Sequence, residues 1–320
     1  MANGIDFTAA QAYKDFVEEF KDDLFAQIFY GFKTGELATP HQGVKGRLVL
    51  TELEVSRDLA RRWNAPFEGF TNTSYTPTML NVVTNKVEHS VIPQEFEGSY
   101  LGMMRRKGQS PTDYPFQAFI LGKIIQKLRS ELEFAAWSGV EAGTPANSDL
   151  LRQTFDGYLQ QITDLITATT ITPVGTGALT QANILASLRT MWDSVDSAYK
   201  ENGTDIFMSY TTYDLYRRAY KDTYNVDPAY IKMEGSSYQG IAFELTNENT
   251  MIHPMPGMGS SSRIVMTPKT NLHYGYDDPS DWGNFRFQEW IRELRFWMDF
   301  NFGVCITQAR DGILVVNDQA

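Results

Sequence analysis

Histidine and cysteine dominate metal sites and nucleophilic sites, and this chain has few of either. They are His41, His89, His253, His273 and Cys305. No two histidines have the spacing of metal ligands, and none is near Cys305 in sequence. Cys305 alternates with apolar neighbours, whereas a nucleophilic thiol needs an activating partner. We therefore expect four unrelated structural or surface histidines and a packed cysteine, with no metal centre and no catalytic dyad.

Acidic residues gather near position 280. Asp277, Asp278 and Asp281 are of the type that binds a hard cation, but the ordered ligand pattern of a calcium loop is absent. With Glu289, the first two could instead provide the paired carboxylates of glycoside hydrolysis. The aromatic residues of segment 282–302 offer a sugar-binding platform as a further alternative. A solvated turn followed by core or interface aromatics is the simpler interpretation, and the alternatives stay open.

Two glycine segments and one basic run are of the types that could bind phosphate or hold a nucleophile. Residues 175–177 lack the third glycine and the following lysine of a phosphate-binding loop. Residues 257–260 do not have the spacing of a nucleophile elbow. The run of Arg105, Arg106 and Lys107 is more typical of salt-bridged contacts than of a phosphate site in an acidic protein. The residues define no catalytic, cofactor-binding or metal site, and this favours a structural protein over an enzyme.

The composition of the chain excludes several further classes of protein. The chain has 320 residues, 42% of them hydrophobic, which is enough for one large domain or two small ones with a real core. The net charge of −11 argues against nucleic-acid binding by phosphate neutralisation. A single cysteine excludes an internal disulfide framework. Neither a signal peptide nor a membrane-spanning run is visible, so we expect no membrane association.

Two very long elements stand out from the rest of the chain. Residues 294–306 alternate apolar and polar or small residues, the pattern of a strand with one buried face. At about 3.3 Å per residue this strand would run roughly 40 Å. Residues 113–138 carry apolar residues at helical spacing, and a helix of that length would span about 39 Å. A helix and a strand of similar length, packed side by side, predict an elongated plate.

The remaining segments suggest an α+β protein with extended limbs. Residues 9–32 form an amphipathic pattern, with Phe16 and Phe20 on an apolar stripe that must cover some surface, on this subunit or on a neighbour. Residues 36–85 have an irregular pattern, with alternation over 47–55 and β-forming residues over 71–83, and predict an extended, partly exposed hairpin or loop excursion. A helix over 180–199, a buried strand over 205–209 and a helix over 213–221, capped by Thr211 or Thr212, form a compact unit.

This order of elements resembles the major capsid protein of tailed double-stranded DNA bacteriophages, which has the Hong Kong 97-type fold. The resemblance covers most of the chain. Three segments carry it most clearly: 131–139, an acidic and small-residue helix end before glycine; 205–209, a strand before a helix; and 271–277, which leads to the long final strand. No helical leader of the kind that serves some members as a built-in scaffold is visible.

The resemblance implies an α+β fold with five named parts. They are an N-terminal arm (1–36), an extended β-hairpin called the E-loop (37–85), a peripheral domain (86–204 and 268–308) with a spine helix (113–138) and a long-stranded sheet, and an axial domain (205–267 and 309–320). In such a fold, the arm and the E-loop reach onto neighbouring copies and bury their apolar surface on assembly.

The resemblance also implies a function. It predicts hexamers and pentamers forming an icosahedral head around double-stranded DNA, located in the virion and assembled in the bacterial cytoplasm, without a cofactor. The partners would be other copies of the chain, a portal, a separate scaffolding protein and cement proteins. The expected intersubunit residues are Arg61, Arg62, Arg105, Arg106, Lys107, Phe16 and Phe20. The alternatives are a carbohydrate-active α+β hydrolase and a β-rich phage tail or adhesin module.

Overall fold

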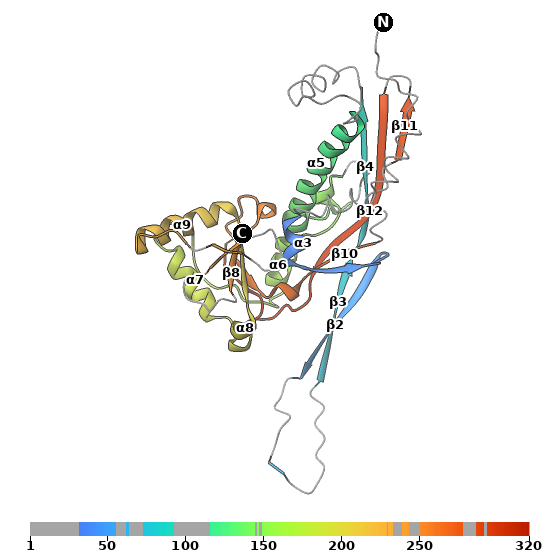
Figure 1. The fold of residues 1–320 in the computed structure, drawn as a ribbon. Helices are drawn as coiled ribbons and strands as arrows, with labels where there is room; N and C mark the ends of the chain where they lie inside the picture. The colour runs from blue at the N-terminus through green and yellow to red at the C-terminus, as the bar shows by residue number, and fades with distance from the viewer. Residues whose placement is uncertain are drawn as a thin grey trace.

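The protein is elongated, with a long sheet, a compact lobe and a projecting hairpin (Figure 1). The computed structural model describes residues 32–55, 62–63, 73–92, 116–144, 146, 149–228, 230–232, 239–242, 250–277, 286–290 and 293–319. The two ends of the described chain both lie within the body, because α3 begins near the lobe and the last strand belongs to it. This shape agrees with the elongated plate that the sequence predicts.

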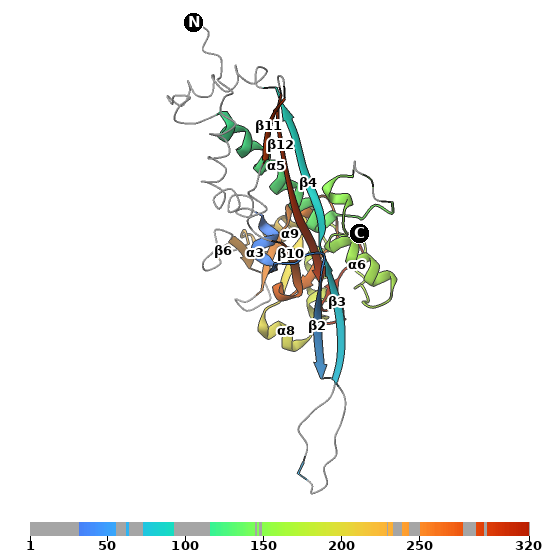
Figure 2. The same ribbon diagram turned by 90° about the vertical axis from the view of Figure 1, so that its right-hand side faces the viewer.

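The long sheet is built around one strand. Its members are β1 (Thr39–Gln42), β4 (Val83–Val91), β10 (Leu272–Tyr276), β11 (Arg286–Trp290) and β12 (Glu293–Ile306). The order is β1-β10-β12-β11, with β4 antiparallel to β12 from Val83 opposite Phe302 to Val91 opposite Leu294. In Figure 2, β4 and β12 run side by side along the upper half of the molecule. The predicted long strand is therefore confirmed.

The period-two pattern of β12 holds over most of its length. Phe296, Met298 and Phe300 are buried, and Asp299 between them is exposed. One face of the strand thus supplies the core while the other meets solvent. The alternation ends after Phe302, where all residues to Ile306 are buried, because the root of the hairpin covers the second face there.

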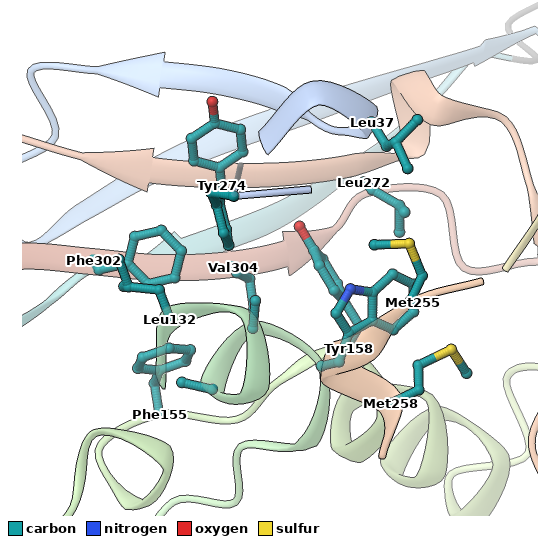
Figure 3. Packing of buried hydrophobic residues seen from close by; sticks show 14 of the residues in the cluster. Leu37, Leu132, Phe155, Tyr158, Met255, Met258, Leu272, Tyr274, Phe302 and Val304 are labelled. Carbon is teal, nitrogen blue, oxygen red and sulfur yellow. The ribbon is translucent and has the colours of Figure 1, made fainter. Parts of the chain in front are cut away.

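The spine helix, α5 (Phe116–Ser138), lies alongside the long sheet and packs on its apolar face. Its buried residues, such as Leu128 and Leu132, share one core with Phe300 and Phe302 of β12. Figure 3 shows Leu132 and Phe302 close together, with Phe155 and Tyr158 completing the layer from the segment after the helix. The predicted helix is confirmed over its described length.

Short elements close this core. They are α3 (Lys33–Leu37), η1 (Leu151–Gln153), α6 (Tyr158–Thr167), η2 (Pro256–Met258) and η3 (Lys269–Asn271). The side chains of Leu37, Leu272, Met255 and Met258 reach the same core from α3, β10 and the segment around η2 (Figure 3). Residues from both ends of the sequence therefore meet against the C-terminal half of the spine helix.

The hairpin consists of β2 (Arg47–Val55) and β3 (Thr73–Asn81). The two strands are antiparallel, with Arg47 opposite Asn81 and Val55 opposite Thr73, and they form a sheet of their own. Both views show them pointing away from the lobe and from the long sheet (Figures 1 and 2). The extended hairpin predicted within residues 36–85 is confirmed.

The compact lobe holds the second sheet, whose order is β13-β9-β5-β8-β7-β6. Its strands are β5 (Asp205–Met208), β6 (Tyr230–Lys232), β7 (Gln239–Ala242), β8 (Met251–Pro254), β9 (Val265–Thr267) and β13 (Val315–Val316). Its helices are α7 (Ile184–Asp193), α8 (Ser197–Asn202) and α9 (Tyr210–Tyr224). A second core joins the apolar sides of α7 and α9 to β5, β8 and β9.

Two local predictions in this lobe are wrong. The single helix expected over 180–199 is broken between Asp193 and Ser197, because the Asp196 N–H bonds to the Gly312 carbonyl instead of continuing a helix. Helix α9 is capped by Ser209, whose hydroxyl accepts from Thr212 N at 3.3 Å, and not by Thr211 or Thr212. The buried residues of α7 belong to the second core.

Candidate assembly surfaces

One face of the hairpin is apolar and exposed. Val49 and Met79 lie directly opposite each other across the two strands, and each is 51% exposed. Tyr75, four residues before Met79 and so on the same face, is 68% exposed. Clustered exposed apolar side chains of this kind mark interaction surfaces in soluble proteins. We call the face formed by Val49, Tyr75 and Met79 the hairpin face.

The opposite face of the hairpin is fixed to the body at its root. Leu48 and Leu50 of β2 pack against a small buried cluster that contains Leu80, Val82 and Cys305. The Val82 N–H also bonds to the Gly46 carbonyl and closes the base of the hairpin. Burial raises the pKa of the Cys305 thiol to about 12, so the thiol stays protonated and packs as a small apolar group. The sequence prediction of a packed cysteine is confirmed.

Two glycines make room for this root. Gly275 of β10 and Gly303 of β12 are cross-strand partners. A Cβ on Gly303 would lie 1.9 Å from the Asn81 carbonyl oxygen, and one on Gly275 would lie 2.9 Å from both Leu80 and Val82 side chains. The backbone at the end of β3 therefore lies directly against β12 at Gly303, and the Leu80 and Val82 side chains fill the space beside Gly275.

Polar contacts add to the anchorage. On β1, the His41 ring nitrogen Nε2 lies 2.8 Å from Nδ1 of His273 on β10. His273 Nε2 lies 2.8 Å from the Thr307 hydroxyl, and Thr78 of β3 donates to the Thr307 carbonyl at 3.2 Å. The expectation of four unrelated histidines is wrong for His41 and His273, because parallel pairing of β1 with β10 brings together residues that are far apart in sequence.

The segment that enters the hairpin is also fixed to the spine helix. Glu133 of α5 is 4% exposed, and its two carboxylate oxygens accept from the Thr34 N–H at 3.2 Å and the Thr34 hydroxyl at 2.8 Å. Trp137 donates its indole N–H to the same hydroxyl at 2.7 Å. Burial raises the pKa of Glu133, and the hydrogen bonds from Thr34 and the charge of Lys33 oppose that rise. Helix α3 is therefore anchored by a buried polar network.

Lys33 connects the same segment to the compact lobe. Its ammonium group donates to the Pro254 carbonyl of β8, and it lies 5.3 Å from the centre of the Tyr210 ring. Burial lowers the pKa of Lys33 to about 8, while the charges of Glu133 and Glu36 act in the opposite direction. Since Thr34 holds the spine helix and Lys33 holds the second sheet, α3 joins the two cores.

A second buried polar cluster lies in the lobe. His253 of β8 is fully buried, and its Nε2 lies 2.9 Å from the Asp205 carboxylate of β5. Lys269 lies 3.5 Å from the other Asp205 oxygen. Burial lowers the pKa of His253, although the Asp205 hydrogen bond and charge raise it in part. The pair has the residue types of the acid–base half of a catalytic site, but both members are inside the core, where they join β5 to β8.

Two grooves border these elements. One, of about 560 Å³, lies between β4, the spine helix and the segment 141–154, and its lining includes Val87, Leu128, Leu150 and Phe300. The other, of about 660 Å³, lies between the hairpin root and α6, and Met79 of the hairpin face lines it. Both linings mix apolar residues with polar and acidic ones, such as Glu131 and Glu141 in the first groove and Asp156 and Asp164 in the second.

The residues predicted for intersubunit contacts fall almost entirely outside the described residues. This holds for Phe16, Phe20, Arg61, Arg105, Arg106 and Lys107. Arg62 is described and exposed. Val49, Tyr75 and Met79 were not among the predicted contact residues. Because alternate residues of a strand share a face, the positions of these three in 47–55 and 73–81 put them on one face of a hairpin.

Of the acidic residues considered for a hydrolytic site, the structure describes the side chain of Asp277. Asp277 is 7% exposed; one of its carboxylate oxygens accepts from the Asn301 side chain at 3.4 Å and lies 4.0 Å from the Lys45 ammonium. Asp278 and Asp281 lie outside the described residues. Over the part of the chain that the structure describes, no group of three or more histidine, cysteine, aspartate or glutamate residues is placed to hold a metal ion. No described helix is both long and apolar enough to cross a bilayer.

Comparison with known proteins identifies the fold. No family profile and no curated protein sequence matches the chain. Solved structures do match. A chain of the satellite phage P4 procapsid including size determination (Sid) protein is 12% identical, with a TM-score of 0.54 over 92% of this chain and 97% of that chain.

Two further matches are similar in extent. A chain from the capsid of an empty GTA particle is 9% identical, with a TM-score of 0.53 over 90% of this chain and 89% of that chain. One from Gordonia phage Cozz is 10% identical, with a TM-score of 0.52 over 89% of this chain and 85% of that chain. The chain thus has the α+β fold of phage capsid proteins, as the resemblance of the sequence predicts.

Proposed function

We propose that this protein is a structural major capsid protein that self-assembles into hexamers and pentamers of an icosahedral phage head enclosing double-stranded DNA. The observation that carries the proposal is the capsid fold combined with an exposed apolar hairpin face on a projecting limb. A two-stranded hairpin is marginal on its own in water, so it gains stability by docking on another surface. A second copy of the chain is the partner that the fold supports.

The grooves described above are suited to receive such a limb. The hairpin face of one copy would lie on the apolar lining near Leu128 and Phe300, or beside α6, of another copy. Many modest contacts repeated around a ring add up through multivalency. Arg61, Arg62, Arg105, Arg106 and Lys107 are proposed to form salt bridges between copies, and Phe16 and Phe20 to bury apolar surface there.

The same proposal implies which proteins the chain binds and where it assembles. The chain would assemble in the cytoplasm of the bacterial host, with a separate scaffolding protein and a portal, and cement proteins would bind the finished shell. The net charge of −11 suits a container that encloses DNA without gripping it. The arm, E-loop, peripheral and axial bounds given above belong to this proposal as well.

Neither alternative function is favoured. A glycoside hydrolase needs two accessible carboxyl groups, and Asp277 is buried and hydrogen-bonded. A tail or adhesin module would use its aromatic residues on an exposed face, whereas Phe296, Phe300 and Phe302 of β12 are in the core.

The test is assembly of the purified full chain, followed by light scattering and negative-stain electron microscopy. Rings or shells are expected from the wild type. Tyr75→Lys places a charge on the hairpin face and should raise the concentration needed for assembly by about tenfold or more, as for loss of a central interface residue. The matched control is Thr76→Lys, one residue on, exposed and on the other face of β3, opposite Glu52.

The control variant should assemble as the wild type does, and both variants should keep the wild-type thermal unfolding midpoint. A wild-type chain that stays monomeric at high concentration and cleaves a glycoside would overturn the proposal. Equal assembly of the two lysine variants would show that the hairpin face is not part of the assembly interface.

A further inference from the structure

The contact between His41 and His273 is unusual because two imidazole rings bond to each other directly. Their nitrogen atoms are 2.8 Å apart and their ring centres 5.0 Å apart. Both residues are partly buried where β1 pairs with β10, immediately before the chain turns into the hairpin. The contact therefore lies at the point where the hairpin is attached to the long sheet.

The surrounding hydrogen bonds are compatible with His41 as the donor between the two rings. The Asn271 side-chain nitrogen donates to Thr267 and to the Gln308 carbonyl, so its Oδ1 is an acceptor. The Thr307 hydroxyl donates to that Oδ1 at 3.1 Å and is left to accept from His273 Nε2. In that arrangement His273 Nδ1 is the unprotonated nitrogen, and His41 Nε2 is the donor of the bond between the rings; in the reverse arrangement the two roles are exchanged, and either way one ring donates to the other.

This arrangement tolerates one added proton and not two. A first proton enters His41 at Nδ1 and leaves the Nε2–H donor in place. A second proton has to enter His273 at Nδ1, where it would face the His41 N–H at a distance suited to one hydrogen. Two donors would then point at each other, and two positive charges would stand side by side.

We propose that His41 and His273 form an acid-sensitive latch, which holds the root of the hairpin to the long sheet at neutral pH and releases it when both rings are protonated. The latch reaches β3 as well, because Thr307, the acceptor from His273, takes a hydrogen bond from Thr78 through its carbonyl. The inference concerns a single chain and does not rest on the proposed function.

The electrostatic surroundings of the two rings also favour release at low pH. Burial lowers the pKa of His273 to about 4, with the charge of His41 acting in the same sense. Burial also lowers the pKa of His41. The Thr270 carbonyl of η3 lies against the His273 ring and opposes the lowering. Lys269, also in η3, pairs with Asp205 in the lobe.

The direction of the pH dependence of latch opening follows from these pKa shifts. With the strand pair detached, each ring would have an ordinary pKa near 6.5. The detached state therefore binds more protons than the latched state between about pH 6.5 and pH 4, and it gains population as the pH falls. For one proton taken up, the opening equilibrium rises by about tenfold for each pH unit.

Hydrogen exchange on the full chain tests the latch. Protection factors are measured by mass spectrometry between pH 7 and pH 4.5 and corrected for intrinsic exchange. Peptides from 39–46 and 272–277 in the wild type should lose protection by at least about tenfold relative to α7. In His41→Gln the amide still donates to His273 but cannot become charged, so the contribution of His41 is removed and the loss should be smaller than in the wild type.

The matched control is His89→Gln, at an exposed histidine on β4 that is not part of the latch. It should lose protection as the wild type does. The His273 ring resonances supply a second readout, since its pKa should rise in His41→Gln when the neighbouring charge is removed. If His41→Gln does not fold, His273→Gln takes its place in the exchange experiment.

Two results would overturn the latch. One is a wild-type strand pair whose protection is independent of pH down to 4.5. The other is an equal loss of protection in the wild type and in His41→Gln. Because the readout is local exchange within one chain, a failure of the latch is distinguishable from a failure of the chain to assemble.

Discussion

Gly275 and Gly303 face each other across β10 and β12 at the position where the hairpin crosses the long sheet. Neither has a side chain to separate the two layers, so Leu80 and Val82 pack against one strand and the Asn81 backbone against the other. The glycine pair fixes where the limb leaves the body. The geometry of the limb is thus set by residues in the second half of the sequence.

The first prediction concerns this crossing. Gly303→Ala should lower the free energy of unfolding by at least about 2 kcal/mol, because overpacking a filled site costs about 1–3 kcal/mol and the nearest atom here belongs to the backbone. Denaturant unfolding followed by circular dichroism measures it. An alanine variant as stable as the wild type would show that the hairpin root is not seated on the strand as described.

Gly122→Ala is the matched control and a prediction in the opposite direction. Gly122 is exposed within α5, and a Cβ placed there meets no atom within 4 Å. Replacing glycine by alanine inside a helix should stabilise the protein by about 0.5–1 kcal/mol. The same denaturant titration applies. A destabilised Gly122→Ala would mean that the spine helix is not a regular helix in solution at this turn.

Much of the architecture could be predicted from periodicity. The alternation in 294–306 predicted the long strand, and the three–four spacing in 113–138 predicted the spine helix. The alternation in 47–55, together with the β-forming residues of 71–83, predicted the hairpin. These signals are local, since each reports which face of one element is buried. The order of such elements was enough to point to the fold.

Contacts between distant segments could not be predicted in this way. The pairing of His41 with His273 depends on which strands become neighbours, and a single sequence does not state that. The break between α7 and α8 likewise depends on Gly312, more than a hundred residues later. Gly275 and Gly303 did leave a signal, because an isolated glycine within a strand pattern often marks a close backbone approach.

The buried network on α3 gives the next prediction. Thr34→Val keeps the shape of the side chain but removes the hydroxyl that accepts from Trp137 and donates to Glu133. Each buried polar group left unpaired costs about 1–3 kcal/mol, so a loss of at least about 2 kcal/mol in unfolding free energy is expected. The pKa of Glu133 should rise further, because the Thr34 hydrogen bond lowers it.

Thr163→Val is the control for this variant. The Thr163 hydroxyl is exposed on α6 and bonds to the Leu159 carbonyl of its own helix. Its loss should change the free energy of unfolding by no more than about 0.5 kcal/mol. Similar effects of the two substitutions would contradict a special role for the network between α3 and the spine helix.

The last prediction uses His253, which is buried in the lobe beside Asp205. Burial lowers its pKa below the ordinary 6.5, so the unfolded chain binds a proton at a higher pH than the folded chain does. The stability that neutral His253 permits is fully present above pH 6.5 and is lost as the pH falls below it.

The free energy of unfolding should therefore fall from pH 7 to pH 5, with a slope from this group of at most about 1.4 kcal/mol per pH unit. His253→Gln removes the titrating ring and should give a flatter profile, while the contribution of the latch at His41 and His273 is unchanged. Denaturant titrations at several pH values measure both slopes. Parallel profiles for the wild type and His253→Gln would contradict a lowered pKa for the buried His253.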